Sequence, residues 1–235
     1  MSQTSSPEPI AAPNAACKRQ PPRFRLEAFE YADRAAVRHL EDLLEDLSAY
    51  VDKFYYAVKL FDAMSVNYHS ASVVNSATVE YNALDHYLSW MRIAARDGAM
   101  TLFHIAKTLD AINSSISKCK LIFELIDRQA LKSARLLFFN SFSNFSAIRH
   151  SVAHSGELFA SEKAKKENSF SGDYEGLGMK IERSIGTIIT EGLYNRTFTN
   201  TYDGEIVSYD ISWENWKILD DMLCALFLVF TSPDR

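Results

Sequence analysis

The distribution of proline and glycine constrains the fold of this chain more than any other feature. Between Arg23 and Ser155 there is no proline and only one glycine, Gly98. Proline breaks helices and glycine weakens them, so a long stretch nearly free of both favours long helices. Five of the six prolines lie in residues 1–22, among Ser, Ala and Gln, which predicts a disordered tail. We therefore expect one mainly helical domain over residues 23–235.

Apolar residues in the proline-free stretch recur every three or four positions, which is typical of buried helix faces. Four such stripes occur, and they cover residues 34–64, 77–95, 102–116 and 128–153. The segment Arg96-Asp97-Gly98 lies between the second and third stripes. The sequence leaves open whether one helix continues past a kink there or a new helix begins.

The remaining seven glycines fall from Gly156 onward, where loops and turns are expected. Residues 156–178 are polar and predict a mobile loop. Two segments rich in Thr, Tyr and β-branched residues, 193–201 and 206–211, flank Asp203-Gly204, a strong hairpin signal. Ser212 is expected to cap the N-terminus of the final helix. The predicted fold class is mainly all-α, an antiparallel helical bundle with one β-hairpin near 193–211 before the C-terminal helix.

The composition indicates a cytoplasmic protein with no membrane span. The three cysteines are scattered and show no metal-ligand spacing, which suits a reducing compartment. No secretory leader is visible, and the longest apolar run, 222–230, is too short to cross a bilayer. No dinucleotide or phosphate-loop motif occurs, so no cofactor is expected.

Positive charge is concentrated in one segment of an acidic chain. The formal net charge is -5, yet residues 118–166 hold nine basic side chains against four acidic ones. A site that binds phosphate would benefit from such a segment. The alternative is a chance cluster of solvated lysines.

The string Arg149-His150-Ser151-Val152-Ala153-His154 lies within this positive segment. On the expected 128–153 helix, Arg149 falls in the middle of an apolar stripe. A guanidinium group on an apolar face loses hydration, so the position predicts a carboxylate or phosphate partner.

Arg149 and His154 are five residues apart, which is about 140° on an ideal helix, so they can meet only if the helix ends. Gly156 is expected to end it as a left-handed cap, with His154 at the negative end of the helix dipole. There a histidine could take a proton from a 2'-hydroxyl while the arginine neutralises the phosphate. Chance also produces this spacing, as Arg34 and His39 show.

No charged residue occurs from Leu136 to Ile148. One face of the expected helix carries only small or uncharged side chains, namely Asn140, Ser143, Asn144, Ala147, Ser151 and His154. A helix without a charged face is covered on both sides. Either a second subunit covers it in a symmetric homodimer, or the chain wraps the helix itself.

The string at 149–154 resembles the motif of the HEPN superfamily, an arginine followed by a polar residue and then a histidine after four to six intervening positions. The resemblance implies a helical bundle that often dimerises with its motifs facing each other. It further implies a metal-independent endoribonuclease that acts as a toxin or in phage defence, with RNA as substrate and an antitoxin protein as a partner. Arg149 and His154 would be the catalytic pair, and His150 would shape their surroundings.

Two other interpretations remain open at the level of sequence. His150 and His154 are spaced i, i+4 and Glu157 follows, a set of ligand types that could hold zinc, although the zincin pattern requires Glu where Ser151 stands. Alternatively, the chain is a non-catalytic module that binds RNA or a nucleotide, with Arg149 anchoring a structural carboxylate or the bound ligand.

Overall fold

The computed structural model describes residues 20–74, 81–176 and 179–230. The predicted tail, residues 1–22, lies outside the described residues except for its last three. The helices are η1 (Leu26–Ala28), α1 (Arg34–Val74), α2 (Tyr81–Ile116), α3 (Lys120–Leu125), α4 (Arg128–Ser141), α5 (Phe145–Ala153), α6 (Ser155–Leu158), α7 (Glu162–Asn168) and α8 (Trp213–Leu228). The strands are β1 (Phe170–Gly176), β2 (Met179–Thr187), β3 (Gly192–Tyr194), β4 (Thr197–Tyr202) and β5 (Glu205–Asp210). The chain is mainly helical, as predicted.

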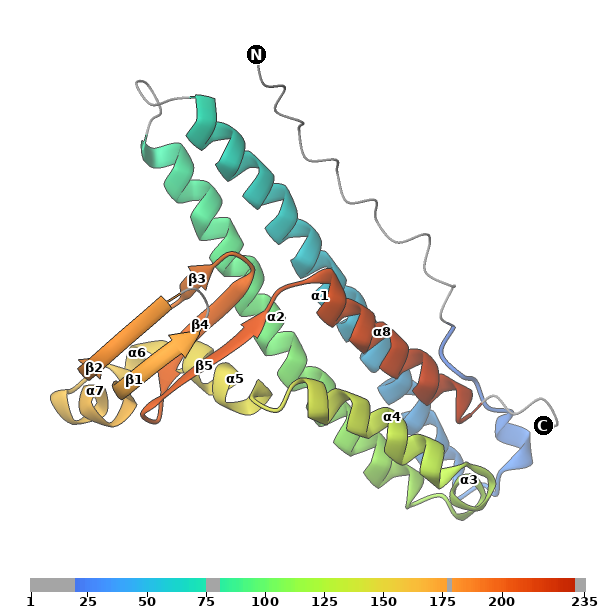
Figure 1. The fold of residues 1–235 in the computed structure, drawn as a ribbon. Coiled ribbons are helices and arrows are strands. Elements are labelled where there is room, and N and C mark those ends of the chain that lie inside the picture. The colour runs from blue at the N-terminus through green and yellow to red at the C-terminus, as the bar shows by residue number, and fades with distance from the viewer. Residues whose placement is uncertain (1–19, 75–80, 177–178, 231–235) are drawn as a thin grey trace.

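The long helices α1 and α2 form an antiparallel pair that is the centre of the molecule (Figure 1). Helix α1 begins at Arg34, as expected, and continues to Val74 rather than ending at residue 64. Helices α4 and α8 pack beside the lower half of this pair. One hydrophobic core joins these helices to the sheet, through residues such as Leu44 on α1, Ile105 on α2 and Phe198 on β4. None of the described helices combines the length and apolar character that a membrane crossing needs.

Helix α2 runs without a break through Arg96-Asp97-Gly98, which answers the question that the sequence left open. Gly98 is needed for packing rather than for a turn. A Cβ atom at this position would lie 2.5 Å from the hydroxyl oxygen of Tyr209, a buried residue of β5. The glycine therefore lets the sheet pack closely on the middle of α2.

The prediction of one helix over 128–153 is wrong, because the chain breaks at Phe142 to form α4 and α5. Phe142 has φ -124° and ψ 48°, outside the helical region, and its side chain is buried in the core. Ser141, Ser143 and Asn144 surround it, and all have weak helix propensity. The break lets α5 turn away from α4 and cross α2 (Figure 1).

The predicted hairpin around Asp203-Gly204 is confirmed in β4 and β5, but the expected first strand, 193–201, is divided into β3 and β4 by a turn at Asn195 and Arg196. These strands pair antiparallel from Thr197 with Asp210 to Tyr202 with Glu205. Asp203 and Gly204 have φ values of 51° and 75°, as a two-residue turn with left-handed residues requires. Strand β3 extends the hairpin to a three-stranded sheet, ordered β3-β4-β5, that packs on α5.

The expectation of a mobile loop at 156–178, and of a single hairpin, is corrected by the structure. This segment contains α6, α7 and β1, and β1 pairs antiparallel with β2 in a second small sheet. Gly172 and Gly186, with φ values of 131° and 75°, lie within these strands near irregular pairing positions. Glycine here accommodates irregularities in a hairpin, a role that composition alone does not distinguish from a loop.

Candidate functional site

The end of α5 brings Arg149 and His154 together. The helix ends at Ala153, and His154 leaves the helical conformation with φ -115° and ψ 21°. Nη1 of Arg149 then lies 3.4 Å from Nε2 of His154. The predicted meeting of these two side chains at a helix end is thus present.

The predicted role of Gly156 is wrong. Among the described glycines, those with positive φ are Gly172, Gly186 and Gly204, whereas Gly156 lies inside the short helix α6. The chain changes direction at His154, which ends α5 and precedes α6 directly. The turn occurs at His154, the residue before α6, and it does not use a left-handed conformation.

His154 is oriented by Glu157. Its Nδ1 lies 3.1 Å from Oε2 of Glu157. A carboxylate only accepts hydrogen bonds, so in the neutral imidazole Nδ1 carries the proton and Nε2 keeps its lone pair. That lone pair faces Arg149, and the His154 side chain is 42% exposed, so a ligand can reach it.

Arg149 has no carboxylate partner within the described residues. Its guanidinium carbon lies 4.8 Å above the ring of Phe103 on α2, and its Nε atom is buried without a hydrogen bond. The sequence predicted a carboxylate or phosphate here, whereas the guanidinium group contacts the half-buried ring of Phe103 and the imidazole of His154. The charge of Arg149 is therefore uncompensated and available to an anionic ligand.

The second Arg-to-His pair behaves differently. Arg34 donates from Nε to the carbonyl oxygen of Phe29, at 3.2 Å, and His39 is exposed on α1. No hydrogen bond between Arg34 and His39 is present in the part of the chain that the structure describes. The same spacing thus yields a joined pair at 149–154 and a separated pair at 34–39.

Among the described residues, His150 forms a hydrogen bond with neither Arg149 nor His154. Its Nδ1 lies 2.9 Å from the carbonyl oxygen of Ser146, one turn earlier in α5. Its ring lies between two others, 6.0 Å from the ring of His154 and 5.9 Å from that of Tyr202 on β4, nearly parallel to both. His150 therefore links His154 to the sheet through ring stacking.

A buried hydrogen bond joins α5 to β4. Nδ2 of Asn200 donates to Oγ of Ser151 at 2.8 Å, and both residues are buried. Sequence reasoning did not identify Asn200 or Tyr202. Their alternate positions in one strand indicate a shared face, but not the helix which that face contacts.

The position of Ser151 also corrects the expected polar face of residues 140–154. The helix break separates α4 from α5, and the chain's own sheet covers Ser151. On α5 the chain itself therefore covers Ser151, while Ala147 and His154 on the same expected face are only half-buried. On α4, Leu136 and Leu137 stay exposed, at 44% and 38%.

The ligand types His150, His154 and Glu157 do not converge as a metal site. Glu157 contacts His154, while the hydrogen bond from His150 goes to a carbonyl oxygen. Within residues 20–74, 81–176 and 179–230, no three or more His, Cys, Asp or Glu side chains gather where they could hold a metal ion.

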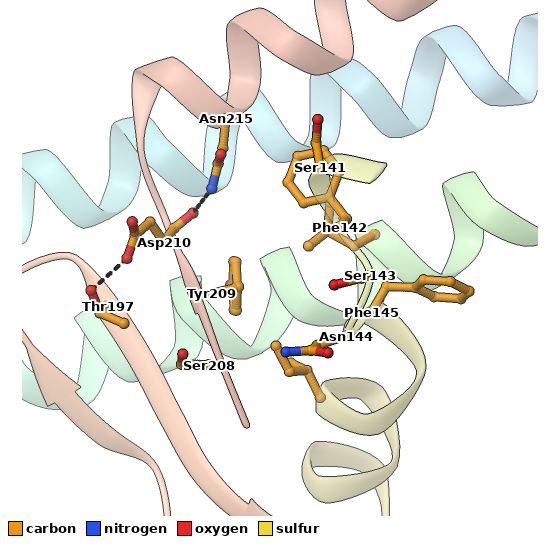
Figure 2. Close-up of a pocket in the computed structure, with 12 residues that line it drawn as sticks. Ser141, Phe142, Ser143, Asn144, Phe145, Thr197, Ser208, Tyr209, Asp210 and Asn215 are labelled. Atoms are coloured by element: carbon orange, nitrogen blue, oxygen red, sulfur yellow. Dashed lines mark hydrogen bonds between the residues drawn. The ribbon is translucent and has the colours of Figure 1, made fainter. Parts of the chain in front are cut away.

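A separate cleft of about 290 Å³ opens at the break between α4 and α5 (Figure 2). The break residues face Thr197, Asp210 and Asn215 across it. Asp210 accepts a hydrogen bond from Thr197 through its carboxylate and from Asn215 through its backbone carbonyl, the latter at 2.7 Å. The cleft includes neither Arg149 nor His154. Its polar residues Thr197, Asp210 and Asn215 already bond to each other.

Comparisons with protein-family models, with curated proteins and with solved structures found no match for this chain.

Proposed function

We propose that this protein is a metal-independent endoribonuclease of the HEPN type, with Arg149 and His154 as its catalytic pair. The observation that carries the proposal is the contact between the guanidinium group of Arg149 and Nε2 of His154, at 3.4 Å. An uncompensated cation beside an oriented imidazole lone pair is the arrangement that cleavage of a phosphodiester by a neighbouring hydroxyl requires.

The proposed reaction needs no group that the chain lacks. The scissile phosphate binds Arg149 in place of the imidazole lone pair that now faces the guanidinium. Nε2 of His154 accepts the proton of the 2'-hydroxyl, whose oxygen attacks the adjacent phosphorus. The bond to the 5'-oxygen breaks, and His154 returns the proton that it accepted to this leaving oxygen. The products are a 2',3'-cyclic phosphate and a free 5'-hydroxyl.

The surrounding residues have positioning roles in this proposal. Glu157 holds the Nδ1–H of His154 and so keeps the lone pair on Nε2. His150 supports the imidazole of His154 by stacking between it and Tyr202. The bond from Asn200 to Ser151 anchors α5, which carries Arg149 and His150 and ends directly before His154.

The biological setting follows from the same resemblance and is also proposed. The protein would act in the cytoplasm as a toxin or in phage defence, controlled by an antitoxin protein. It would act as a homodimer, and the adjacent exposed side chains of Leu136 and Leu137 on α4 support this. Sedimentation of the wild type against Leu136→Glu would test the dimer.

The catalytic proposal is tested by incubating the protein with single-stranded RNA in EDTA. His154→Ala should lower the cleavage rate by about 10²–10⁴-fold, the usual contribution of a general base. Arg149→Lys keeps the charge but loses the planar guanidinium, so it should also be impaired. His39→Ala is the matched control, because this histidine has the same spacing from an arginine without contacting it, and it should cleave normally.

Product chemistry adds a second criterion. A substrate with 2'-deoxyribose at the cleavage position should resist cleavage, and the 3' ends should be cyclic phosphates. If His154→Ala cleaves as fast as the wild type, the proposed catalytic pair is wrong. If the wild type binds RNA without cleaving it, the chain is the non-catalytic binding module instead.

A further inference from the structure

Phe103 on α2 contacts two cations. The guanidinium carbon of Arg149 is 4.8 Å from the centre of its ring, and Nζ of Lys107, one turn along α2, is 5.4 Å from the same point. The ring is half-buried and Lys107 is exposed. The catalytic arginine is thus the first member of a longer group of cations and rings.

The group continues from α5 onto α4. The ring of Phe145 lies 6.4 Å from Phe103 and 6.0 Å from Phe139 on α4. The guanidinium carbon of Arg135 lies 5.7 Å from the centre of the Phe139 ring. These rings are half-buried, so each presents part of its surface to solvent.

At its far end the group reaches a cavity of about 340 Å³ between the end of α2, α3 and α4. Arg128, Lys132 and Arg135, three cations on one face of α4, line it. The guanidinium carbon of Arg128 lies 5.0 Å from the centre of the Phe123 ring, which is 40% exposed. Nε of Arg135 is buried there without a partner.

Little negative charge opposes these cations. Asp110 bonds to Arg135 at 2.9 Å, and it is the acidic partner that the described residues offer to this group. The nearby Asp127 accepts hydrogen bonds from Gln129 and Ala130 at the start of α4, and Glu124 pairs with Lys120. In a chain whose net charge is -5, this local excess of positive charge favours a polyanionic ligand.

We infer that the seam between α2 and α4 binds single-stranded RNA and leads it to the pair Arg149 and His154. We call this seam the α2–α4 track and define it by the cations Arg128, Lys132, Arg135 and Lys107 and the rings Phe139 and Phe103. The inference rests on the proposed function, because it supplies the substrate-binding surface of that site.

Cations interleaved with aromatic rings match the chemistry of an unpaired strand. Lysine and arginine bind the phosphates, and a ring can stack on any base that has no pairing partner. In a duplex the base faces are already stacked, so half-buried rings along a seam have no free face to contact.

The length of the track also fits several nucleotides. Residues 103 to 116 of α2 flank it and span about 20 Å at the helical rise. At about 3.4 Å per phosphate along a stacked strand, this corresponds to about six nucleotides. A dinucleotide would reach only the catalytic pair, whereas a 12-nucleotide RNA would occupy the catalytic pair and the α2–α4 track together.

Binding is tested in the His154→Ala protein, which does not consume its ligand, by fluorescence anisotropy with a labelled 12-nucleotide single-stranded RNA. The double variant Arg128→Ala/Lys132→Ala removes two exposed cations. Its Kd should rise at least about fivefold, and the slope of log Kd against log salt should fall by about 1.4, since each contact to a single strand contributes about 0.7. The matched control is Lys59→Ala/Lys217→Ala, which removes two exposed cations from α1 and α8.

Cleavage in the presence of His154 separates the track from the catalytic proposal. The double variant should cleave the 12-nucleotide RNA with a raised KM, yet cleave a dinucleotide at the wild-type rate. If the wild type cleaves and the double variant matches the control in Kd and salt slope, the track is overturned while the catalytic pair stands. If no cleavage occurs but the double variant alone loses binding, the track stands and the catalytic proposal fails. Equally tight binding of a 12-base-pair duplex would overturn the choice of single-stranded RNA.

Discussion

Replacing Gly98 with alanine should destabilise this protein, although alanine normally strengthens a helix. Inside a helix, Gly→Ala contributes about 1 kcal/mol of stability. Here the new Cβ would lie 2.5 Å from Oη of Tyr209, about 1 Å closer than an ordinary contact. Either the Tyr209 ring or α2 must move.

The cost of that movement follows from what holds Tyr209. Its hydroxyl donates to the carbonyl oxygen of Ala95, and its ring packs edge-on against Phe198, 6.1 Å away. Losing the hydrogen bond of a buried group costs about 1–3 kcal/mol. Overpacking adds about 1–3 kcal/mol. After the gain in helix propensity, we expect Gly98→Ala to lower the free energy of unfolding by about 1–5 kcal/mol.

The sign should reverse when the hydroxyl is absent. In Tyr209→Phe the closest remaining atoms to the new Cβ, Cζ of residue 209 and Cε2 of Phe54, are each 3.5 Å away, which is ordinary contact. Gly98→Ala in that background should therefore stabilise the protein by about 0.5–1 kcal/mol.

Urea unfolding of the four proteins in this double-mutant cycle measures both effects. The free energies of unfolding, extrapolated to water, should give opposite signs for Gly98→Ala in the two backgrounds. If Gly98→Ala is stabilising in the wild type, or equally destabilising in both backgrounds, then the Tyr209 hydroxyl is not the reason for the glycine.

Three further predictions concern the site and the sheet that supports it. Glu157→Gln should slow RNA cleavage by about tenfold or less, because the exposed carboxylate orients the base without touching substrate; a loss as large as that of His154→Ala would contradict this role. Asn200→Ala leaves the Ser151 hydroxyl without its donor and should lower the free energy of unfolding by about 1–3 kcal/mol, measured by thermal or urea unfolding. An unchanged free energy of unfolding would mean that this hydrogen bond does not anchor α5. Burial, and then the charge of Asp97, raises the pKa of Tyr209. Folding therefore favours the neutral phenol, so the contribution of Tyr209 to the free energy of unfolding is constant below about pH 10. Above that pH it falls by up to about 1.4 kcal/mol per pH unit. The free energy of unfolding of Tyr209→Phe, measured between about pH 9 and pH 11, should lack this fall.

The regular helices were predictable because their apolar residues repeat along the chain. The stripe that begins near Arg34 and the final helix after Ser212 both form as expected, and Ser212 accepts a hydrogen bond from the backbone N–H of Asn215. Their ends were less predictable. Helix α1 continues to Val74, since no proline or glycine interrupts it. The apolar stripe alone does not mark the residue at which the helix ends.

The helix break and the second sheet depend on contacts distant in sequence. The periodicity of residues 128–153 continues across Phe142, yet the chain breaks there while Phe142 packs into the core. Gly172 and Gly186 are typical of loops, yet both lie in a paired hairpin. Local composition does not reveal which strand a segment will pair with.

For the candidate site, the local sequence was enough to identify the two residues and to place them near the end of a helix. Arg149 and His154 were identifiable by residue type, spacing and nearness to a helix end, and all of these are local properties. Which of the two Arg-to-His pairs meets depends on the folded chain, since the backbone turns at His154, whereas α1 continues past His39. Folding also supplies their surroundings: Phe103 from α2 under the guanidinium, and Tyr202 and Asn200 from β4 against α5. These partners come from elements about 50 residues away, and packing of the whole chain, not spacing along it, brings them together.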